Sequence, residues 1–195
     1  MQKFRNLTIL VIAAAGVAAR GSRWRTERQI HTGPRAGESF PVEVPSTVQV
    51  LSTFAGGQHG THLLSFDSAL ERHGVVEIHG SEGSIVLPDP NRFDGRIAYV
   101  TPLGIIRDGM SFEQEWIEIQ QEGPVTGRGL GLLDMVRAIQ DGRPHVASGE
   151  VGYHVLDIML SAEESAERGE FVTVESSVDT VPVLPEGFDP LAKTL

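Results

Sequence analysis

The sequence predicts an α+β fold, in which helices cover one face of a large and mostly antiparallel sheet. Short apolar runs separated by glycine-rich turns continue as far as residue 119, which is the pattern of an antiparallel meander. Two helical patterns then follow one another between residues 127 and 169, and one short strand pattern comes after them. Because strands and helices do not alternate, these observations favour α+β over a parallel α/β fold.

The length and composition fit one domain with a substantial core. The chain has 195 residues, of which 40% are hydrophobic. The net charge is −10, which argues against a nucleic-acid partner because phosphate binding needs a basic surface. The chain has no cysteine, so a disulfide framework, a thiolate nucleophile and a cysteine-ligated zinc site are excluded. A reducing, cytoplasmic location fits this composition.

The first 16 residues form an apolar segment that has two interpretations. Lys3 and Arg5 precede an apolar run over residues 7–19 that ends in small side chains, as in a secretory signal peptide. The run is too short to span a bilayer, which takes about 20 apolar residues, so no membrane partner is expected. We prefer the second interpretation, a strand or short helix of the fold, because no clear linker follows. Export is the alternative.

A basic stretch over residues 21–37 is expected to form a loop, because glycine and proline punctuate it. Five arginines within this stretch or directly before it form a cationic patch in an acidic chain, namely Arg20, Arg23, Arg25, Arg28 and Arg35. Arginine side chains together with His31 could bind an anion or sugar hydroxyl groups. A solvated edge strand with its loop would have the same composition, so both interpretations stay open.

Strand patterns follow from residue 42 onwards. Alternating valines lie on both sides of Pro45, which should bend or end the pairing. The expected strands are residues 48–54, 61–67, 74–79, 84–87, 96–100 and 112–119. Glycine-rich connections at residues 55–60 and 80–83 predict hairpins.

Two helices are expected between residues 127 and 169. Apolar residues recur at helical spacing from Leu132 to Ile139, and Gly142 with Pro144 should end this helix. Ser148 is expected to cap the second helix and Gly169 to end it. The predicted apolar stripe of the second helix comprises Val151, Val155, Ile158, Met159, Ala162 and Ala166. Residues 171–174 then predict a returning strand, and residues 182–195 an extended tail that contains prolines.

Three short motifs resemble functional signatures, but their contexts do not fit. The glycine loop at residues 127–131 has its third glycine one position too early for a dinucleotide fingerprint, and a second helix follows instead of a strand. The G-S-E-G turn at residues 80–83 joins two strands, whereas a nucleophile elbow joins a strand to a helix. His59 and His62 would point to opposite faces of a strand, so no metal site is expected.

His154 lies between Val151 and Val155, near the boundary of the stripe on the second helix. A histidine at such a boundary is commonly packed and hydrogen-bonded. The alternative is a place in a ligand pocket, where the imidazole could bond to a hydroxyl group.

Taken together, the chain resembles the C-terminal, substrate-side half of the oxidoreductases typified by glucose–fructose oxidoreductase and inositol dehydrogenase, the Gfo/Idh/MocA family. Three stretches carry this resemblance: the G-P-R-A-G-E loop with P-V-E-V-P at residues 33–45, the hairpin and I-H-G-S-E-G-S turn at residues 53–84, and the helix pair with R-A-I and G-R-P at residues 127–169. Their order and spacing match from about residue 17 to residue 174.

The resemblance implies a large antiparallel sheet with helices on one face, dimerisation through the open face, and a relationship to NAD(P)-dependent oxidation or reduction of sugars and polyols. It gives no catalytic or cofactor-binding residue here. The lysine of the family's E-K-P motif has no counterpart, since the lysines of this chain are Lys3 and Lys193. The family's D-x-x-x-H pair precedes the matched region, and residues 1–16 contain neither Asp nor His.

We therefore expect residues 17–181 to be the substrate-side domain of such an oxidoreductase, truncated and inactive alone, with NAD(P) implied only for a full-length relative. His31, Arg35 and His154 are the candidates for binding a small sugar or polyol. We expect copies of the chain to associate with one another through the open sheet face. One alternative is a non-catalytic dimerisation or binding module of the same fold, and another is a gene fragment whose true start lies upstream.

Overall fold

A computed structural model describes residues 14–70, 76–91, 93–101, 116–120, 127–179 and 181. The described residues fall into two units: one within residues 1–69 and 137–183, the other within residues 70–136 and 184–195. The first contains a four-stranded sheet, a two-stranded arm and one long helix, and the second contains another four-stranded sheet. All described strand pairs are antiparallel, so the α+β class is confirmed.

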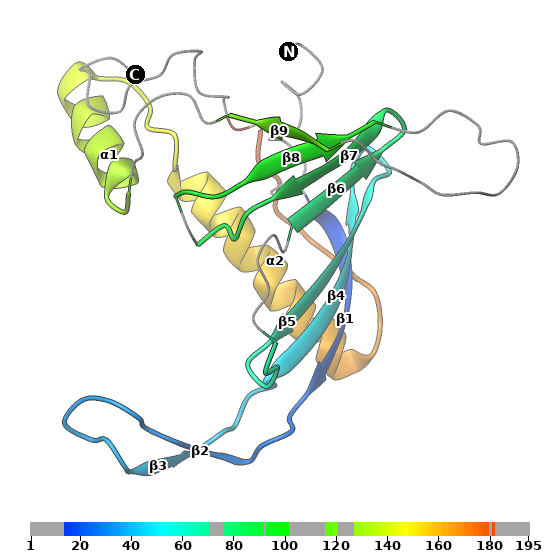
Figure 1. The fold of residues 1–195 in the computed structure, drawn as a ribbon, viewed down its shortest axis with the longest axis vertical. Coiled ribbons are helices and arrows are strands. Elements are labelled where there is room, and N and C mark those ends of the chain that lie inside the picture. Colours follow the sequence, from blue (N-terminus) through cyan, green and yellow to red (C-terminus); the bar gives the residue numbers. More distant parts are fainter. Residues whose placement is uncertain are drawn as a thin grey trace, which may run out of the picture. The chain divides into compact units, whose positions relative to one another are not determined.

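The first sheet has the strand order β10-β1-β4-β5 (Figure 1). Its strands are β1 (Ala14–Ser22), β4 (Thr47–Phe54), β5 (His59–Ser65) and β10 (Val172–Thr173). The predicted hairpin at residues 55–60 joins β4 to β5, and the returning strand pairs with β1. Because β1 begins at Ala14, the second half of the N-terminal apolar run is a strand, as preferred above. The interpretation of residues 1–13 lies outside the described residues, as does the predicted tail at residues 182–195.

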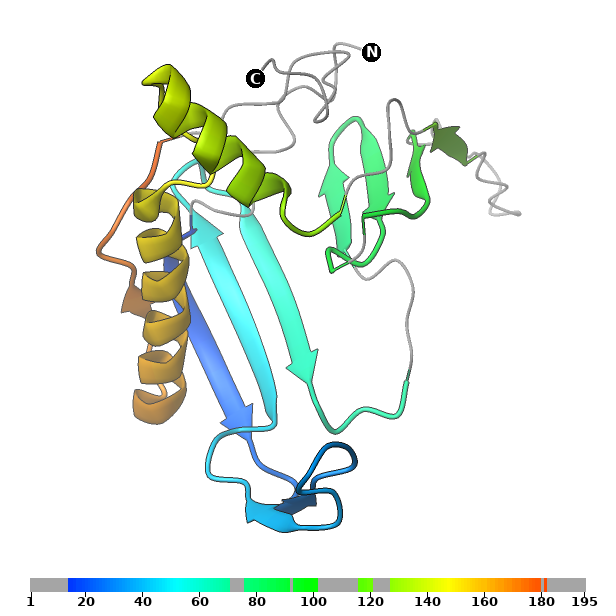
Figure 2. The same cartoon turned by 90° about the vertical axis from the view of Figure 1, so that its left-hand side faces the viewer.

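The long helix α2 (Gly149–Arg168) begins and ends where the sequence predicts. The Ser148 hydroxyl accepts a hydrogen bond from the Val151 amide at 3.3 Å, and Gly169 ends the helix in the left-handed conformation, with φ of 74°. The helix packs on β1 and β10 (Figure 2). Buried apolar side chains from the helix and the sheet form the core, namely Val17, Ala19, Val50, Ala162 and Val174.

The buried face of α2 coincides only in part with the predicted apolar stripe, of which Ala162 is buried and Ile158 and Ala166 pack against the core. Val155 and Met159 are exposed, whereas His154, Ser161, Ala162 and Ser165 are buried. The reason is the close approach of the helix to β1, which small side chains permit. There the Ser165 hydroxyl accepts a hydrogen bond from the Ala19 amide at 2.8 Å and donates one to the Glu170 carbonyl at 2.5 Å.

Most of the predicted basic loop is a two-stranded arm. Its strands β2 (Glu27–Gln29) and β3 (Ser39–Pro41) pair with each other, and the loop between them turns at Gly33 and Gly37, which have φ values of 87° and 93°. The arm extends from the end of the sheet where Ser22 pairs with Thr47 (Figure 1).

The second unit contains a meander with strand order β6-β7-β8-β9. Its strands are β6 (Val76–Gly80), β7 (Gly83–Leu87), β8 (Ile97–Val100) and β9 (Ile117–Ile119). Ile85 on β7 and Ala98 and Val100 on β8 are buried. The tight turn at residues 80–83 joins β6 to β7, as predicted. Parts of two predicted strands, at residues 74–75 and 112–115, lie outside the described residues.

The remaining helix, α1 (Leu130–Asp141), spans the boundary between the units. Its predicted apolar residues do not form a buried stripe, since Leu132 is 65% and Ile139 74% exposed. Within the described residues, neither helix is long and apolar enough to cross a membrane.

Candidate functional site

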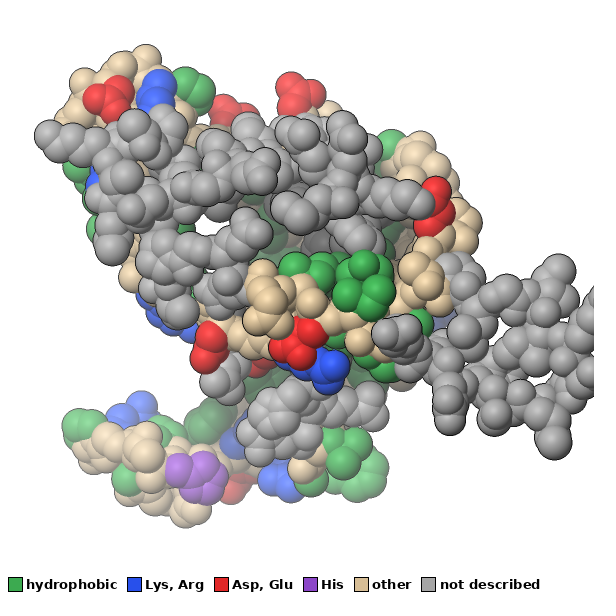
Figure 3. All heavy atoms as spheres, turned by 45° about the horizontal axis from the view of Figure 1, so that its top comes forward, with side chains coloured by type: hydrophobic (Ala, Val, Ile, Leu, Met, Phe, Trp, Pro, Cys, Tyr) green, Lys and Arg blue, Asp and Glu red, His purple; other side chains and the backbone are tan. Residues whose placement is uncertain are grey.

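Two of the predicted site residues lie on the loop of the arm. The side chains of His31 and Arg35 are exposed there, and Arg35 forms a local ion pair with Glu38, with 2.8 Å between nitrogen and oxygen. Figure 3 shows basic and histidine side chains on the surface of the arm. Such a loop presents hydrogen-bond donors to solvent.

The third predicted residue, His154, lies in the first half of α2 and is only 1% exposed. Its Nδ1 is 2.7 Å from the Ser176 hydroxyl oxygen, and the Ser176 amide donates to the Asp157 carboxylate at 2.8 Å. Hydrogen bonding from Ser176 lowers the pKa of Asp157 below its ordinary value of 3.8. His154 therefore helps to attach the segment after β10 to α2, as a packed and hydrogen-bonded histidine would.

The structure does not bring the three predicted residues together. Helix α2 runs in the same direction as β1, since Ser165 lies beside Ala19 and the Gly169 carbonyl binds Arg20. His154 precedes Ser165 by eleven residues, or about 16 Å of helix, and so lies toward the end of the sheet opposite to the arm. A joint substrate-binding role of His31, Arg35 and His154 remains a prediction.

A hollow with a mainly apolar lining lies elsewhere in the first unit, between α2 and the part of its sheet that β4 and β5 form. We call it the helix-side groove, and its volume is about 520 Å³. Valine, phenylalanine and leucine side chains of the sheet form its floor, and α2 forms one wall. The apolar lining residues are Ala14, Val17, Pro45, Val48, Val50, Phe54, Leu64, Ile158, Met159, Ala162 and Ala166.

The helix-side groove has two kinds of polar group. On its floor, the Ser52 hydroxyl and His62 Nε2 are hydrogen-bonded at 2.9 Å across the β4–β5 pair. On its helix wall, Glu163 and Glu167 have no ion-pair partner among the described residues. Ser52 is 3% exposed, so this hydroxyl needs the imidazole as a partner. The arrangement could hold an apolar body that carries a positive charge near α2.

Sequence reasoning missed this groove, although it considered His62 as a metal ligand. The hairpin register was the signal that could have found the Ser52–His62 pair, because alternation places Val50, Ser52 and His62 on one face once β4 and β5 are paired. Among the described residues, no cluster of three or more His, Asp or Glu side chains could hold a metal ion.

A second hollow lies on the opposite face of the same sheet and has a volume of about 580 Å³. We call the face of the sheet that contains this second hollow the open face. Leu51 and Leu63 are 58% and 64% exposed there, beside Arg20 and Phe171. Neighbouring exposed leucines on a sheet face are typical of a surface that another molecule covers.

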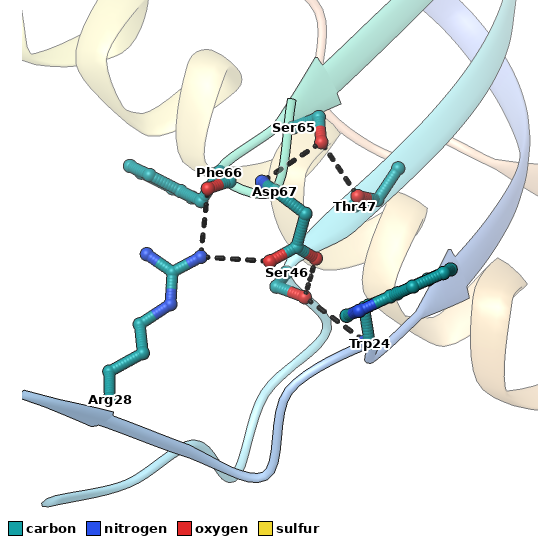
Figure 4. Close-up of polar contacts among 7 residues, drawn as sticks. All are labelled: Trp24, Arg28, Ser46, Thr47, Ser65, Phe66 and Asp67. Carbon is teal, nitrogen blue, oxygen red and sulfur yellow. Dashed lines mark hydrogen bonds and ion pairs between the residues drawn. The ribbon is translucent and has the colours of Figure 1, made fainter. Parts of the chain in front are cut away.

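A polar cluster attaches the arm to the first sheet (Figure 4). The Arg28 guanidinium donates to the Asp67 carboxylate at 3.0 Å and to the Phe66 carbonyl at 2.8 Å. Asp67 also accepts a hydrogen bond from the buried Ser46 hydroxyl. This hydroxyl, followed by the Arg28 guanidinium, holds the pKa of the Asp67 carboxyl below its ordinary value of 3.8. These bonds join Arg28 of β2 to the residues directly after β5 and directly before β4, so the cluster fixes the base of the arm.

Comparison with solved structures finds close matches in fold. A levoglucosan dehydrogenase in complex with NADH and levoglucosan matches with a TM-score of 0.63 and 24% identity, over 86% of this chain and 46% of that one. An NAD-binding oxidoreductase from Klebsiella pneumoniae matches with a TM-score of 0.62 and 18% identity, over 85% and 46% of the two chains. An aldose–aldose oxidoreductase from Caulobacter crescentus, complexed with glycerol, gives 0.57 and 16%, over 83% and 41%.

No family model matches the sequence, and no curated protein matches it either. The chain spans less than half the length of the solved structures that it resembles. The resemblance that the sequence indicated is thus found again in three dimensions, and the chain has the fold of part of these sugar-related oxidoreductases.

Proposed function

We propose that this chain is the substrate-side domain of an NAD(P)-dependent oxidoreductase that acts on a sugar or polyol. One observation carries the proposal: 86% of the chain matches a dehydrogenase whose structure holds NADH and levoglucosan. A neighbour in complex with L-sorbose, and another with glycerol, support a polyhydroxylated substrate. The cysteine-free sequence supports a cytoplasmic location.

In this proposal the cofactor and the catalytic residues come from outside the chain. The matched structures are about twice as long as the matched region, which leaves room in them for a nucleotide-binding half. The sheet domain would then hold and orient the sugar, and the groups that bind the nicotinamide and move the proton would belong to the other half. The chain alone would be inactive.

Calorimetry of the purified chain tests this division of roles. We expect no saturable binding of NADH or NADPH in the micromolar range. We also expect no NAD-dependent oxidation of levoglucosan, L-sorbose or glycerol by the chain alone. Saturable micromolar binding of either nucleotide would contradict the proposal, because the chain would then contain a cofactor site.

A non-catalytic dimerisation module is the second candidate, and the open face favours it. Leu51 on β4 and Leu63 on the edge strand β5 are exposed on that face, where they line the second hollow. Two copies, or one copy and a longer relative, could cover these leucines by packing sheet against sheet. Size-exclusion chromatography with light scattering should then give a dimer, and a strict monomer at high concentration would count against this candidate.

A further inference from the structure

The turn at residues 80–83 joins two strands and is no nucleophile elbow, but the serine that follows it has a base within reach. Ser84 is the second residue of β7 and lies directly opposite His79 of β6 in the antiparallel pair (Figure 1). Its hydroxyl oxygen is 2.8 Å from His79 Nδ1. A hydroxyl at hydrogen-bond distance from an imidazole is the arrangement in which a base activates a nucleophile.

A carboxylate lies beside the other nitrogen of the same ring. Glu77 precedes His79 by two residues on β6, so both side chains point to the same face of the sheet. The Glu77 Oε2 atom is 3.5 Å from His79 Nε2. Its negative charge favours the tautomer that carries the proton on Nε2, which leaves the Nδ1 lone pair free to accept from the Ser84 hydroxyl. The three side chains are thus ordered as nucleophile, base and orienting carboxylate.

Two other serine–histidine hydrogen bonds among the described residues show what distinguishes this one. In the first unit, Ser52 is 3% exposed where it meets a histidine of β5, and His154 is 1% exposed where it meets a serine. Neither of those two imidazole rings forms an ion pair with a carboxylate in the described part of the chain. By contrast, the side chain of His79 is 68% exposed and Ser84 is half-buried. A small reagent can therefore reach this pair from solvent.

We propose that Ser84 is a site of acylation by small acyl donors that have a good leaving group, such as aryl esters and thioesters. His79 is the general base for this reaction, and Glu77 is the residue that positions His79. This inference concerns the second unit by itself and does not depend on the proposed oxidoreductase function.

The acylation step follows from the geometry. Ser84 Oγ attacks the acyl carbonyl carbon while its proton passes to His79 Nδ1, and the new C–O bond forms a tetrahedral intermediate. Collapse of this intermediate breaks the bond to the phenolate or thiolate leaving group, which takes the proton from the imidazolium or leaves it to solvent. The Glu77 carboxylate stabilises the imidazolium in between. The product is a serine ester, whose alkoxide leaving group is poorer than a phenolate, so the acyl group should accumulate on Ser84.

Labelling of the full chain with p-nitrophenyl acetate under native conditions tests the proposal. After denaturation, tryptic digestion gives a peptide of residues 73–92, which contains both Ser81 and Ser84, and mass spectrometry locates the acetyl group. Ser81 is the matched control, because it is exposed but is not hydrogen-bonded to an imidazole in the described structure. We expect Ser84 to be acetylated at least about tenfold faster than Ser81, since general bases typically contribute about 10²–10⁴-fold.

Variants assign the base. His79→Ala should lower the acetylation of Ser84 to the rate of Ser81. The control variant is His59→Ala, which removes an exposed histidine of the first unit and should leave the labelling of Ser84 unchanged. The comparison of the two serines in the wild-type chain needs no substitution, so it tests the proposal even where a variant fails to fold.

The positioning role of Glu77 has its own readout. Glu77→Ala should slow the acetylation of Ser84 several-fold, and ¹⁵N chemical shifts of the His79 ring should show less of the tautomer protonated on Nε2. Glu77→Gln keeps an oxygen acceptor and should restore part of the rate. An unchanged tautomer in Glu77→Ala would overturn this role, because a merely structural glutamate would not affect the ring proton.

Three results would overturn the proposal itself. Equal acetylation of Ser81 and Ser84 would mean that the hydrogen bond does not activate the hydroxyl. An unchanged rate at Ser84 in His79→Ala would mean that the imidazole is not its base. Release of p-nitrophenolate that is equally fast in Ser84→Ala and wild type, without a stable adduct in either, would mean that His79 itself is the nucleophile.

Discussion

Gly60 lies where the floor of the helix-side groove leaves no room for a side chain. A Cβ atom at this position would come within 2.6 Å of the Ser52 hydroxyl oxygen and 3.0 Å of His62 Nε2. At the scale of single residues, the groove is thus shaped by the glycine as much as by the polar pair beside it.

Gly60→Ala should destabilise the first unit, because the new methyl group must displace Ser52 or His62. We expect a loss of about 1–3 kcal/mol in the free energy of unfolding, measured by urea denaturation. Gly80→Ala is the matched control, since Gly80 is also a strand glycine and its Cβ would meet its nearest neighbour at 3.7 Å. Equal losses in both variants would show that the effect is not steric.

Asp67 makes the stability of the arm base depend on pH. Its pKa is lower in the folded chain than the ordinary 3.8, so its contribution is fully present above pH 4 and is lost as the pH falls through the folded value. Asp67→Asn should therefore destabilise the chain at pH 7 and make little difference near pH 2, as followed by thermal unfolding. Ser46→Ala removes the strongest cause of the shift and should weaken the same pH dependence. A difference between wild type and Asp67→Asn that does not change with pH would contradict this account.

At the scale of elements, helix α2 shows which structural features could be predicted from the sequence and which could not. Its ends were predictable, because Ser148 and Gly169 act within one turn of the helix. Its buried face was not predicted from the apolar stripe alone. Ser165 is completely buried because it bonds to Ala19, which is 146 residues away in the chain. A periodic pattern reveals that a helix has an apolar side, but the partner strand decides which small polar residues are buried with it.

The Ser165 hydroxyl should be important for packing α2 on β1. Ser165→Ala leaves the Ala19 amide without this acceptor in a buried place, so we expect a loss of about 1–3 kcal/mol in urea denaturation. Ser161→Ala is the control on the same helix face, because Ser161 is buried at 5% exposure but has no hydrogen-bond partner among the described residues. A loss in the control as large as in the test would assign the effect to packing volume instead.

The hairpin strands could also be predicted from local sequence signals, whereas the arm pairing and the groove could not. Alternation and glycine turns predicted β4, β5, β6 and β7 within a few residues, since these signals lie inside each hairpin. The arm was expected as a loop or solvated edge strand, and its short exposed strands carry too little apolar pattern to reveal their pairing. The helix-side groove needs α2 and β5 together, and no local pattern specifies that arrangement.

At the scale of the whole molecule, the first sheet presents two uncovered surfaces that call for different partners. The helix-side groove has the acidic side chains of Glu163 and Glu167 at its α2 wall. The open face has the exposed side chains of Leu51 and Leu63, and Arg20 lines the same hollow.

Leu63 and Leu64 distinguish these two surfaces, because they are adjacent on β5 and equally exposed but point to opposite faces. Leu63→Glu should shift a dimer toward monomer in light scattering by placing a charge in the sheet-to-sheet contact. Leu64→Glu should leave the oligomeric state unchanged and lower the unfolding midpoint instead, by placing the charge in the helix-side groove. If Leu64→Glu alone dissociated the dimer, the interface would lie on the helix side.

The arm has a further consequence for how the chain withstands proteolysis. Its loop is exposed on all described residues from His31 to Arg35, while its base is fixed by Arg28, Ser46 and Asp67. Trypsin should therefore cut after Arg35 under native conditions long before it attacks the sheet. The two fragments would stay associated, because β1 precedes the cut and pairs with β4 beyond it. The arm could thus be opened at its end, or extended there by inserted residues, without unfolding the sheet that supports it.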